Sequence, residues 1–172
     1  MNMVILLCRK KSIVAKEIAE ILTFHGANHI TDSMILQKSG RFTVVTKTQG
    51  IDLKLNNAVV VFCDGSKQFR NLPLSKGIIG VCEETDRIAL EILARSDAPV
   101  ITCGMNQKNT VTLSSLNGDI WFTSLQRSLL DFKGNDVLPS EFKIKLKKRY
   151  KPFSVLAAAT VLLLNGIKPC EF

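Results

Sequence analysis

A short basic turn near the N-terminus contains the residues of this chain that are best suited to hold a phosphate. Arg9, Lys10 and Lys11 follow an apolar run, and Ser12 is a favourable N-cap for the helix expected behind it. The N-terminus of a helix has free N–H groups and partial positive charge, and cationic side chains add charge-assisted hydrogen bonds. The spacing therefore predicts a phosphate-binding turn at Arg9, Lys10, Lys11 and Ser12. A solvated basic turn without a ligand is an equally good interpretation.

The same turn, residues 8–12, contains no glycine. Glycine lets successive backbone N–H groups turn inward around a phosphate, whereas bulky side chains crowd such a nest. We therefore expect this turn to differ from the glycine-rich phosphate loops of nucleotide-binding proteins.

Four of the five cysteines stand where apolar runs end. The carboxyl ends of parallel strands lie along one edge of a sheet, where α/β proteins bind their ligands. A thiol or metal site at this edge is one interpretation. Cysteine is also a small apolar residue that fits beneath a tight turn, and the chain has no CxxC pair, so we favour a structural role and expect no metal site. The four residues are Cys8, Cys63, Cys82 and Cys103.

Short apolar strands alternate with helices over the first 104 residues. The runs at 3–7 and 58–63 have no polar break, which is typical of strands buried on both faces of a parallel sheet. A helix follows the first run, and a second helix is expected behind Thr85 or Glu84. The alternation predicts an α/β fold with a mostly parallel, doubly wound sheet of the P-loop or Rossmann-like kind and helices on both faces. Further elements are strands at 41–47, 77–82 and 99–103, a helical turn at 66–71, and a strand or part of a helix at 30–37.

The pattern changes in the second half of the chain. Segments 110–115 and 119–124 are joined by an Asn-Gly turn, which is a hairpin signal. Further antiparallel strands are expected at 128–133 and 141–146. Together these segments predict a small antiparallel β-meander.

A helix over 153–165 closes the chain. Pro152 suits its first turn, and Gly166 is the expected stop. We therefore expect one domain over 1–172, made of a parallel α/β body (1–104), a β-meander (105–147) and a C-terminal helix that packs back (148–172).

The composition is that of an ordinary globular protein with a basic balance. Hydrophobic residues make up 46% and charged residues 22% of the 172 residues, and the net charge is +8. No apolar run reaches the ~20 residues that a membrane span requires. The first lysine follows the N-terminal apolar run and does not precede it as in a signal peptide. We therefore expect a cytoplasmic protein that does not bind membranes.

Residues 143–151 carry six of the basic residues. Such a cluster can bind nucleic acid, anionic lipid or a phosphorylated ligand. Lysine alternates with Ile144 and Leu146, however, which is the period of a strand, and exposed lysines on an edge strand block pairing between sheets. We favour this second interpretation and expect no nucleic-acid partner.

We interpret two other sets of polar residues as structural. Glu83, Glu84 and Asp86 stand at a helix start, where carboxylates offset the helix dipole. His25 and His29 flank the exit of the first helix and have no serine or cysteine partner that the sequence places near them. We expect both histidines to be ordinary turn residues.

Three stretches of the chain resemble the central, ATP-binding domain of the Mur ligase family, which contains the ATP-dependent amide ligases of peptidoglycan synthesis and the folylpolyglutamate synthases. Residues 6–12 stand where the family has its strand and T-G-T-N-G-K-T-T loop. Residues 81–86, followed by a helix and by 100–104, are similar to the family's N-A-D-D stretch, helix and V-I-T-F-G strand. Residues 148–159, ending at 164–167, resemble G-R-H-N-x-x-N-A-L-A-A followed by L-G-I. The resemblance covers most of the chain in order.

This resemblance implies roles for individual residues. Lys11 matches the family's phosphate-binding lysine, and Ser12 matches the hydroxyl residue that holds magnesium, so that ATP and Mg²⁺ are the implied cofactors. Arg149, Tyr150 and Ser154 stand at the family's His-Asn-x-x-Asn motif, whose asparagine meets adenine. The resemblance therefore implies that these three residues form the edge of a nucleotide site.

The departures from the family pattern argue against ligation. The phosphate loop lacks its glycines, no Glu-x-Ser-Ser stretch supplies a second magnesium site, and we expect no counterpart of the family's C-terminal domain. Ligation needs a cradled triphosphate, bound magnesium and a closing lid. We therefore predict a degenerate, truncated relative without cofactor, which acts as a binding or scaffold protein with a protein partner or a second copy of itself and is not an enzyme on its own. The alternative is residual binding of a nucleotide or another small anionic ligand at Cys8–Ser12, with the chain as one part of a split ATP-dependent ligase.

Overall fold

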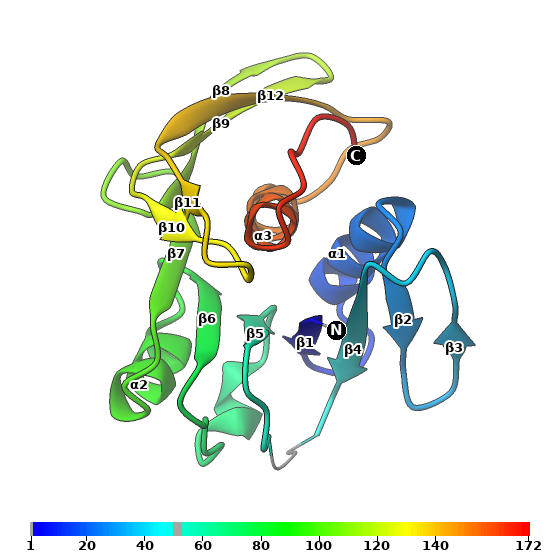
Figure 1. Ribbon diagram of the computed structural model, residues 1–172, viewed down its shortest axis with the longest axis vertical. Coiled ribbons are helices and arrows are strands. Elements are labelled where there is room, and N and C mark those ends of the chain that lie inside the picture. The colour runs from blue at the N-terminus through cyan, green and yellow to red at the C-terminus, as the bar shows by residue number, and fades with distance from the viewer. Residues whose placement is uncertain (1, 50–52) are drawn as a thin grey trace.

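One curved sheet carries most of the chain (Figure 1). The computed structural model describes residues 2–49 and 53–172, and within these ranges ten strands belong to this sheet. Its central pairs are parallel, and antiparallel pairs lie toward both edges. Across the sheet, the strands are β12 (Ser140–Lys145), β9 (Ile120–Leu125), β8 (Val111–Asn117), β7 (Val100–Gly104), β6 (Ile78–Glu83), β5 (Ala58–Phe62), β1 (Asn2–Leu7), β4 (Phe42–Lys47), β2 (Asn28–Ile30) and β3 (Ile35–Leu36).

The strand β1 lies between β4 and β5 and is buried on both faces. Val4 and Leu6 belong to the apolar cluster on one side of the sheet, and Ile5 and Leu7 belong to the cluster on the other. Side chains of a strand alternate between its faces, so an uninterrupted apolar run needs cover on both. The predicted doubly wound, mostly parallel sheet is confirmed.

Helices cover both faces of the sheet. Figure 1 shows the sheet curving around α3 with α1 beside it, while α2 lies on the outer face. Ser12 caps α1 as predicted, because its hydroxyl accepts a hydrogen bond from the backbone N–H of Ala15 at 3.1 Å. The helices are α1 (Ile13–Phe24), α2 (Arg87–Arg95) and α3 (Pro152–Leu164), with a 3₁₀ turn, η1 (Ser66–Phe69), on the face of α2.

The helix α3 is apolar around its whole circumference because it lies between α1 and the concave side of the sheet (Figure 1). All its residues after Pro152, from Phe153 to Leu164, are buried. Gly166 follows the helix with a φ of 68° and ends it, as predicted. The hydroxyl of Ser154 is buried without a hydrogen-bond partner in the described part of the chain, which is an unfavourable environment for a polar atom.

The predicted meander continues the parallel sheet and does not stand apart from it. β8 pairs in parallel with β7, and β9 and β12 follow in antiparallel order. The strand expected at 128–133 is wrong in extent, because only Leu129–Leu130 (β10) is extended and paired. Its partner is Asp136–Val137 (β11), in a separate two-stranded ribbon.

The edge strand β12 has the alternation that the sequence predicts. Phe142 and Ile144 are buried, whereas Lys143 and Lys145 are exposed. The last residues of the described chain run along this edge, where the backbone N–H of Lys145 donates to the carbonyl of Cys170 at 3.0 Å. The lysines therefore flank an edge that is partly covered, which confirms the edge-strand interpretation of 143–147.

The structure resolves two local expectations. Asp86 caps α2 by accepting from the backbone N–H of Ala89 at 3.0 Å, so the expected caps Thr85 and Glu84 are wrong. The ambiguous segment 30–37 forms the end of β2 and the short strand β3. Within the described residues, none of the helices combines the length and apolar character that crossing a bilayer requires.

Replacement of Ser154 by alanine should stabilise the protein. The change removes a buried, unpartnered hydroxyl and favours the helix, so the free energy of unfolding should rise by about 1 kcal/mol. Ser12→Ala is the matched control, because loss of the N-cap should lower the free energy of unfolding by about 1 kcal/mol. Chemical denaturation measures both; destabilisation by Ser154→Ala would show that this hydroxyl has a partner.

Candidate functional site

The turn at Cys8–Ser12 connects β1 to α1 at the carboxyl edge of the sheet. Lys11 has a φ of 60°, a left-handed conformation that side chains rarely adopt. The hydroxyl of Ser12 is engaged as the N-cap of α1, and the residue is only 8% exposed. The hydroxyl that the family resemblance assigns to magnesium therefore accepts one hydrogen bond from α1.

Asp64 binds Arg9 through both oxygens of its carboxylate. Oδ1 accepts a hydrogen bond from the backbone N–H of Arg9 at 3.1 Å, and Oδ2 accepts one from Nε–H of Arg9 at 3.2 Å. Asp64 stands two residues after β5, the parallel neighbour of β1, so strand pairing brings it to the turn. An acidic side chain therefore lies against an N–H group of the turn.

The segment behind β5 holds the turn at further points. The backbone N–H of Cys63 donates to the carbonyl of Leu7 at 2.9 Å, and the side-chain amide of Gln68 donates to the carbonyl of Cys8 at 2.7 Å. Gly65 has a φ of 70°, and a Cβ at this position would lie 3.0 Å from Cβ of Arg9. Glycine therefore allows the close approach of the two segments.

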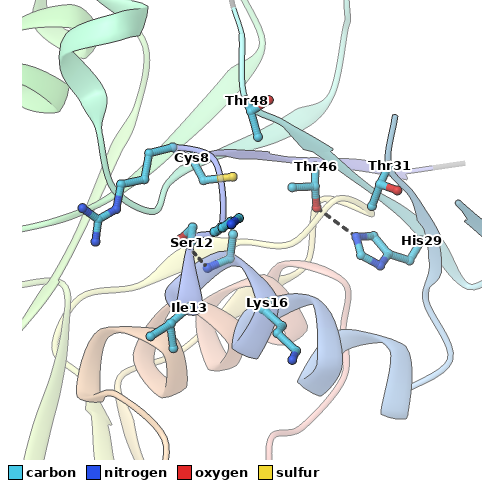
Figure 2. A pocket seen from close by; sticks show the side chains of 11 residues that line it. Cys8, Ser12, Ile13, Lys16, His29, Thr31, Thr46 and Thr48 are labelled. Carbon is cyan, nitrogen blue, oxygen red and sulfur yellow. Dashed lines mark hydrogen bonds between the residues drawn. The ribbon is translucent and has the colours of Figure 1, made fainter. Parts of the chain in front are cut away.

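A cavity of about 490 Å³ lies beside the turn, between the first turns of α1 and the ends of β2 and β4 (Figure 2). Arg9, Lys11 and Lys16 contribute three cationic side chains to its lining, together with the hydroxyl residues Ser12, Thr31, Thr46 and Thr48. Of the predicted phosphate-binding residues, Arg9, Lys11 and Ser12 line this cavity, whereas Lys10 does not.

His29 lies in the wall of the same cavity, and its expected position in a turn is wrong. It belongs to β2, and its Nε2 lies 2.9 Å from the hydroxyl oxygen of Thr46 on β4 (Figure 2). Burial lowers the pKa of His29 below its ordinary value of 6.5, so the ring is neutral at pH 7. The sequence contained no signal for this role, because the parallel pairing of β2 with β4 is not encoded locally.

None of the three residues expected at a nucleotide edge lines the cavity beside the turn. Ser154 is fully buried in α3, so its side chain faces the core and not a ligand site. Arg149 lines a second cavity of about 290 Å³ with Trp121 and Asp119, which shares no lining residue with the first. Tyr150 packs against the core and has the Lys148 ammonium 5.1 Å from its ring centroid.

Contacts to neighbouring elements hold part of the basic segment before α3. Lys148 forms an ion pair with Glu20 at 2.6 Å, and the backbone N–H of Lys151 donates to Glu17 at 3.0 Å. These contacts tie the segment to the exposed side of α1. Of the basic side chains in this segment, Lys148 is paired with Glu20 and Lys147 with Glu171 at 3.7 Å.

The four cysteines lie along one edge, as predicted, at the ends of four adjacent strands. All four are buried, and burial with the nearby Asp64 carboxylate raises the pKa of Cys8 to about 11. Burial likewise raises the pKa of Cys82 and of Cys103 to about 12, and that of Cys63 well above its ordinary value. Within the described ranges, no group of three or more His, Cys, Asp or Glu residues is placed to hold a metal ion. These thiols are therefore protonated at neutral pH.

The acidic group before α2 has structural contacts. Asp86 caps the helix and also accepts a hydrogen bond from the hydroxyl of Ser66. Glu84 accepts a hydrogen bond from the side-chain amide of Asn109 at 2.6 Å. Only Asp86 borders the helix, since Glu83 is the last residue of β6.

Comparison with known proteins shows which solved structures resemble this architecture. No protein-family model matches the sequence, and no curated protein is significantly similar to it. The UDP-N-acetylmuramate:L-alanyl-gamma-D-glutamyl-meso-diaminopimelate ligase from Neisseria meningitides matches with a TM-score of 0.58 and 13% identity, over 97% of this chain and 62% of its own. MurF from Acinetobacter baumannii matches with a TM-score of 0.56 and 12% identity, over 98% of this chain and 43% of its own. A point mutant of FPGS from L. casei matches with a TM-score of 0.54 and 11% identity, over 96% of this chain and 58% of its own.

The chain has a Mur-ligase-like fold. This confirms the resemblance stated from the sequence at the level of the fold. The Mur-ligase-like chain spans between 43% and 62% of the lengths of these three structures. In this chain, the Cys8–Ser12 turn connects the first strand with the first helix.

Thiol reactivity should separate the buried cysteines from the exposed Cys170. At pH 8, a thiol reagent should modify the native protein rapidly at Cys170 alone, because the other four thiols are buried and have raised pKa values. Cys170→Ser should abolish the rapid phase. Rapid modification of Cys8 in the native Cys170→Ser protein would contradict the burial of the edge.

Acid should weaken the protein through His29. Because burial lowers the pKa of this residue in the folded state, the unfolded chain binds the proton first as pH falls. Its contribution to stability should be lost as pH falls below about 6.5 and level off below the lowered pKa of the folded state. His29→Gln should therefore flatten the dependence of the melting temperature on pH between about 7 and 5. An unchanged slope would show that other groups cause the loss.

Proposed function

We propose that this chain is a non-catalytic domain with a Mur-ligase-like fold, which acts as a binding or scaffold protein and does not drive ATP-dependent ligation. The observation that carries this proposal is the pair of hydrogen bonds between Asp64 and Arg9. A triphosphate loop presents successive backbone N–H groups to the phosphates. Here a carboxylate takes one of these groups, and its charge opposes a phosphate at the same place.

The residues of the turn also fit a magnesium-bound triphosphate poorly. The hydroxyl of Ser12 is used as a helix cap, and the carboxylate of Asp64 is bound by a guanidinium. Each oxygen therefore already accepts a hydrogen bond from the protein, which leaves fewer lone pairs for a metal ion. This supports a turn without ATP and Mg²⁺ as cofactors.

A second candidate, binding of a small anionic ligand beside the turn, is favoured by the cavity. A volume of about 490 Å³ is within the range of small-molecule sites. Lys11 and Lys16 line it, and neither forms an ion pair with another described residue. Side-chain cations could thus hold a single phosphate or carboxylate group without a backbone nest. In this case the chain would be the ligand-binding part of a split ligase.

Nucleotide titration followed by thermal unfolding tests both candidates. A ligand in hundredfold excess over its Kd stabilises by about 2.7 kcal/mol. The first candidate expects no shift with millimolar ATP and Mg²⁺ and no release of phosphate. The second expects a shift that does not need Mg²⁺, that Lys11→Ala abolishes and that Lys10→Ala retains, since Lys10 does not line the cavity. ATP hydrolysis that requires Mg²⁺ and is lost in Lys11→Ala would overturn the non-catalytic proposal.

A further inference from the structure

We propose that Asp64 is a built-in competitor for anions at the Cys8–Ser12 turn, an autoinhibitory contact in which a carboxylate of the protein stands where a phosphate would bind. The inference rests on the proposed function, because it concerns the same turn and the proposal that this turn does not hold a triphosphate. It differs in what it predicts, namely that removal of one negative charge creates a binding activity.

The geometry is that of a bound anion supplied by the chain itself. The carboxylate of Asp64 accepts from a backbone N–H and from the side chain of the same residue, Arg9, with one oxygen for each. An external phosphate would use these same two kinds of donor. The carboxylate reaches the turn from a neighbouring strand and is not part of the turn, so it is a separate group that occupies the donors.

The residues that follow Asp64 in the chain hold its contact with Arg9 in place. Gly65 allows the backbone behind β5 to approach Arg9 closely, and Gln68 of η1 binds the carbonyl of Cys8. The side chain of Asp64 is 23% exposed, whereas that of Arg9 is 71% exposed. The carboxylate is therefore the positioned partner of the pair, and the guanidinium reaches it from solvent.

The charge of Asp64 acts on the surroundings of the turn. Burial is the largest cause of the raised pKa of Cys8, and the charge of Asp64 is the second. This carboxylate therefore opposes a negative charge at the end of β1. Cys8 also lines the adjacent cavity, so the carboxylate acts on a residue of its wall. Without Asp64, Arg9 would join Lys11 and Lys16 as a third unpaired cation in the lining.

Asp64→Asn tests this inference directly. The amide oxygen can still accept from the backbone N–H of Arg9, while the negative charge is removed. Isothermal titration with inorganic pyrophosphate at low ionic strength should show at least roughly tenfold tighter binding by the variant than by the unchanged protein. The gain should shrink as salt is added.

Asp32→Asn is the matched control. It removes the same charge from an ion pair with Lys47 at 2.7 Å, next to Thr31 of the same cavity, but within the described residues no hydrogen bond or ion pair joins Asp32 to the turn. It should change the affinity for pyrophosphate far less than Asp64→Asn does. An equal gain in affinity for pyrophosphate in both variants would show that the gain comes from the net charge of the protein, and it would overturn the proposal.

Further outcomes are also decisive. Unchanged affinity in folded Asp64→Asn protein would overturn the competitor role, and Asp64→Ser serves as the second variant if the asparagine variant does not fold. Failure of this inference is distinguishable from failure of the proposed function. The latter would appear as ATP hydrolysis by the unchanged protein, whatever Asp64→Asn does to pyrophosphate binding.

Discussion

The parallel pairing of β1 with β4 and β5 is the constraint on which the rest of the structure depends. A strand that is apolar on both faces must be covered on both, and α1 and α3 on one side and α2 and η1 on the other meet this need. The same pairing carries the ends of β4 and β5 to the turn behind β1. The residues that surround the turn are therefore a consequence of the register of the central strands.

The second organising element is α3. Its neighbours on all sides are apolar, since the sheet curves around it from β7 to β12 and α1 lies beside it (Figure 1). Such a core accepts many apolar sequences of similar volume. This explains how the chain can share a fold with Mur ligases at 11–13% identity.

The elements that were predicted correctly are those whose signals are local. The apolar run of β1, the cap at Ser12 and the stop at Gly166 depend on residues adjacent in sequence. The candidate site was predicted only in part. Its own turn was identified, but the role of His29 was missed and Ser154 was assigned to a ligand edge although it is buried in the core.

The sequence by itself determined that β1 is a buried strand, that α1 starts behind a basic turn without glycine, and that the fold is α/β. These features follow from the periodicity and conformational preferences of neighbouring residues. Only the tertiary structure decided that Asp64 meets Arg9 and that His29 meets Thr46, residues 55 and 17 positions apart. Such contacts depend on the order and register of parallel strands, which are set by packing of the whole sheet and by no short stretch of the chain.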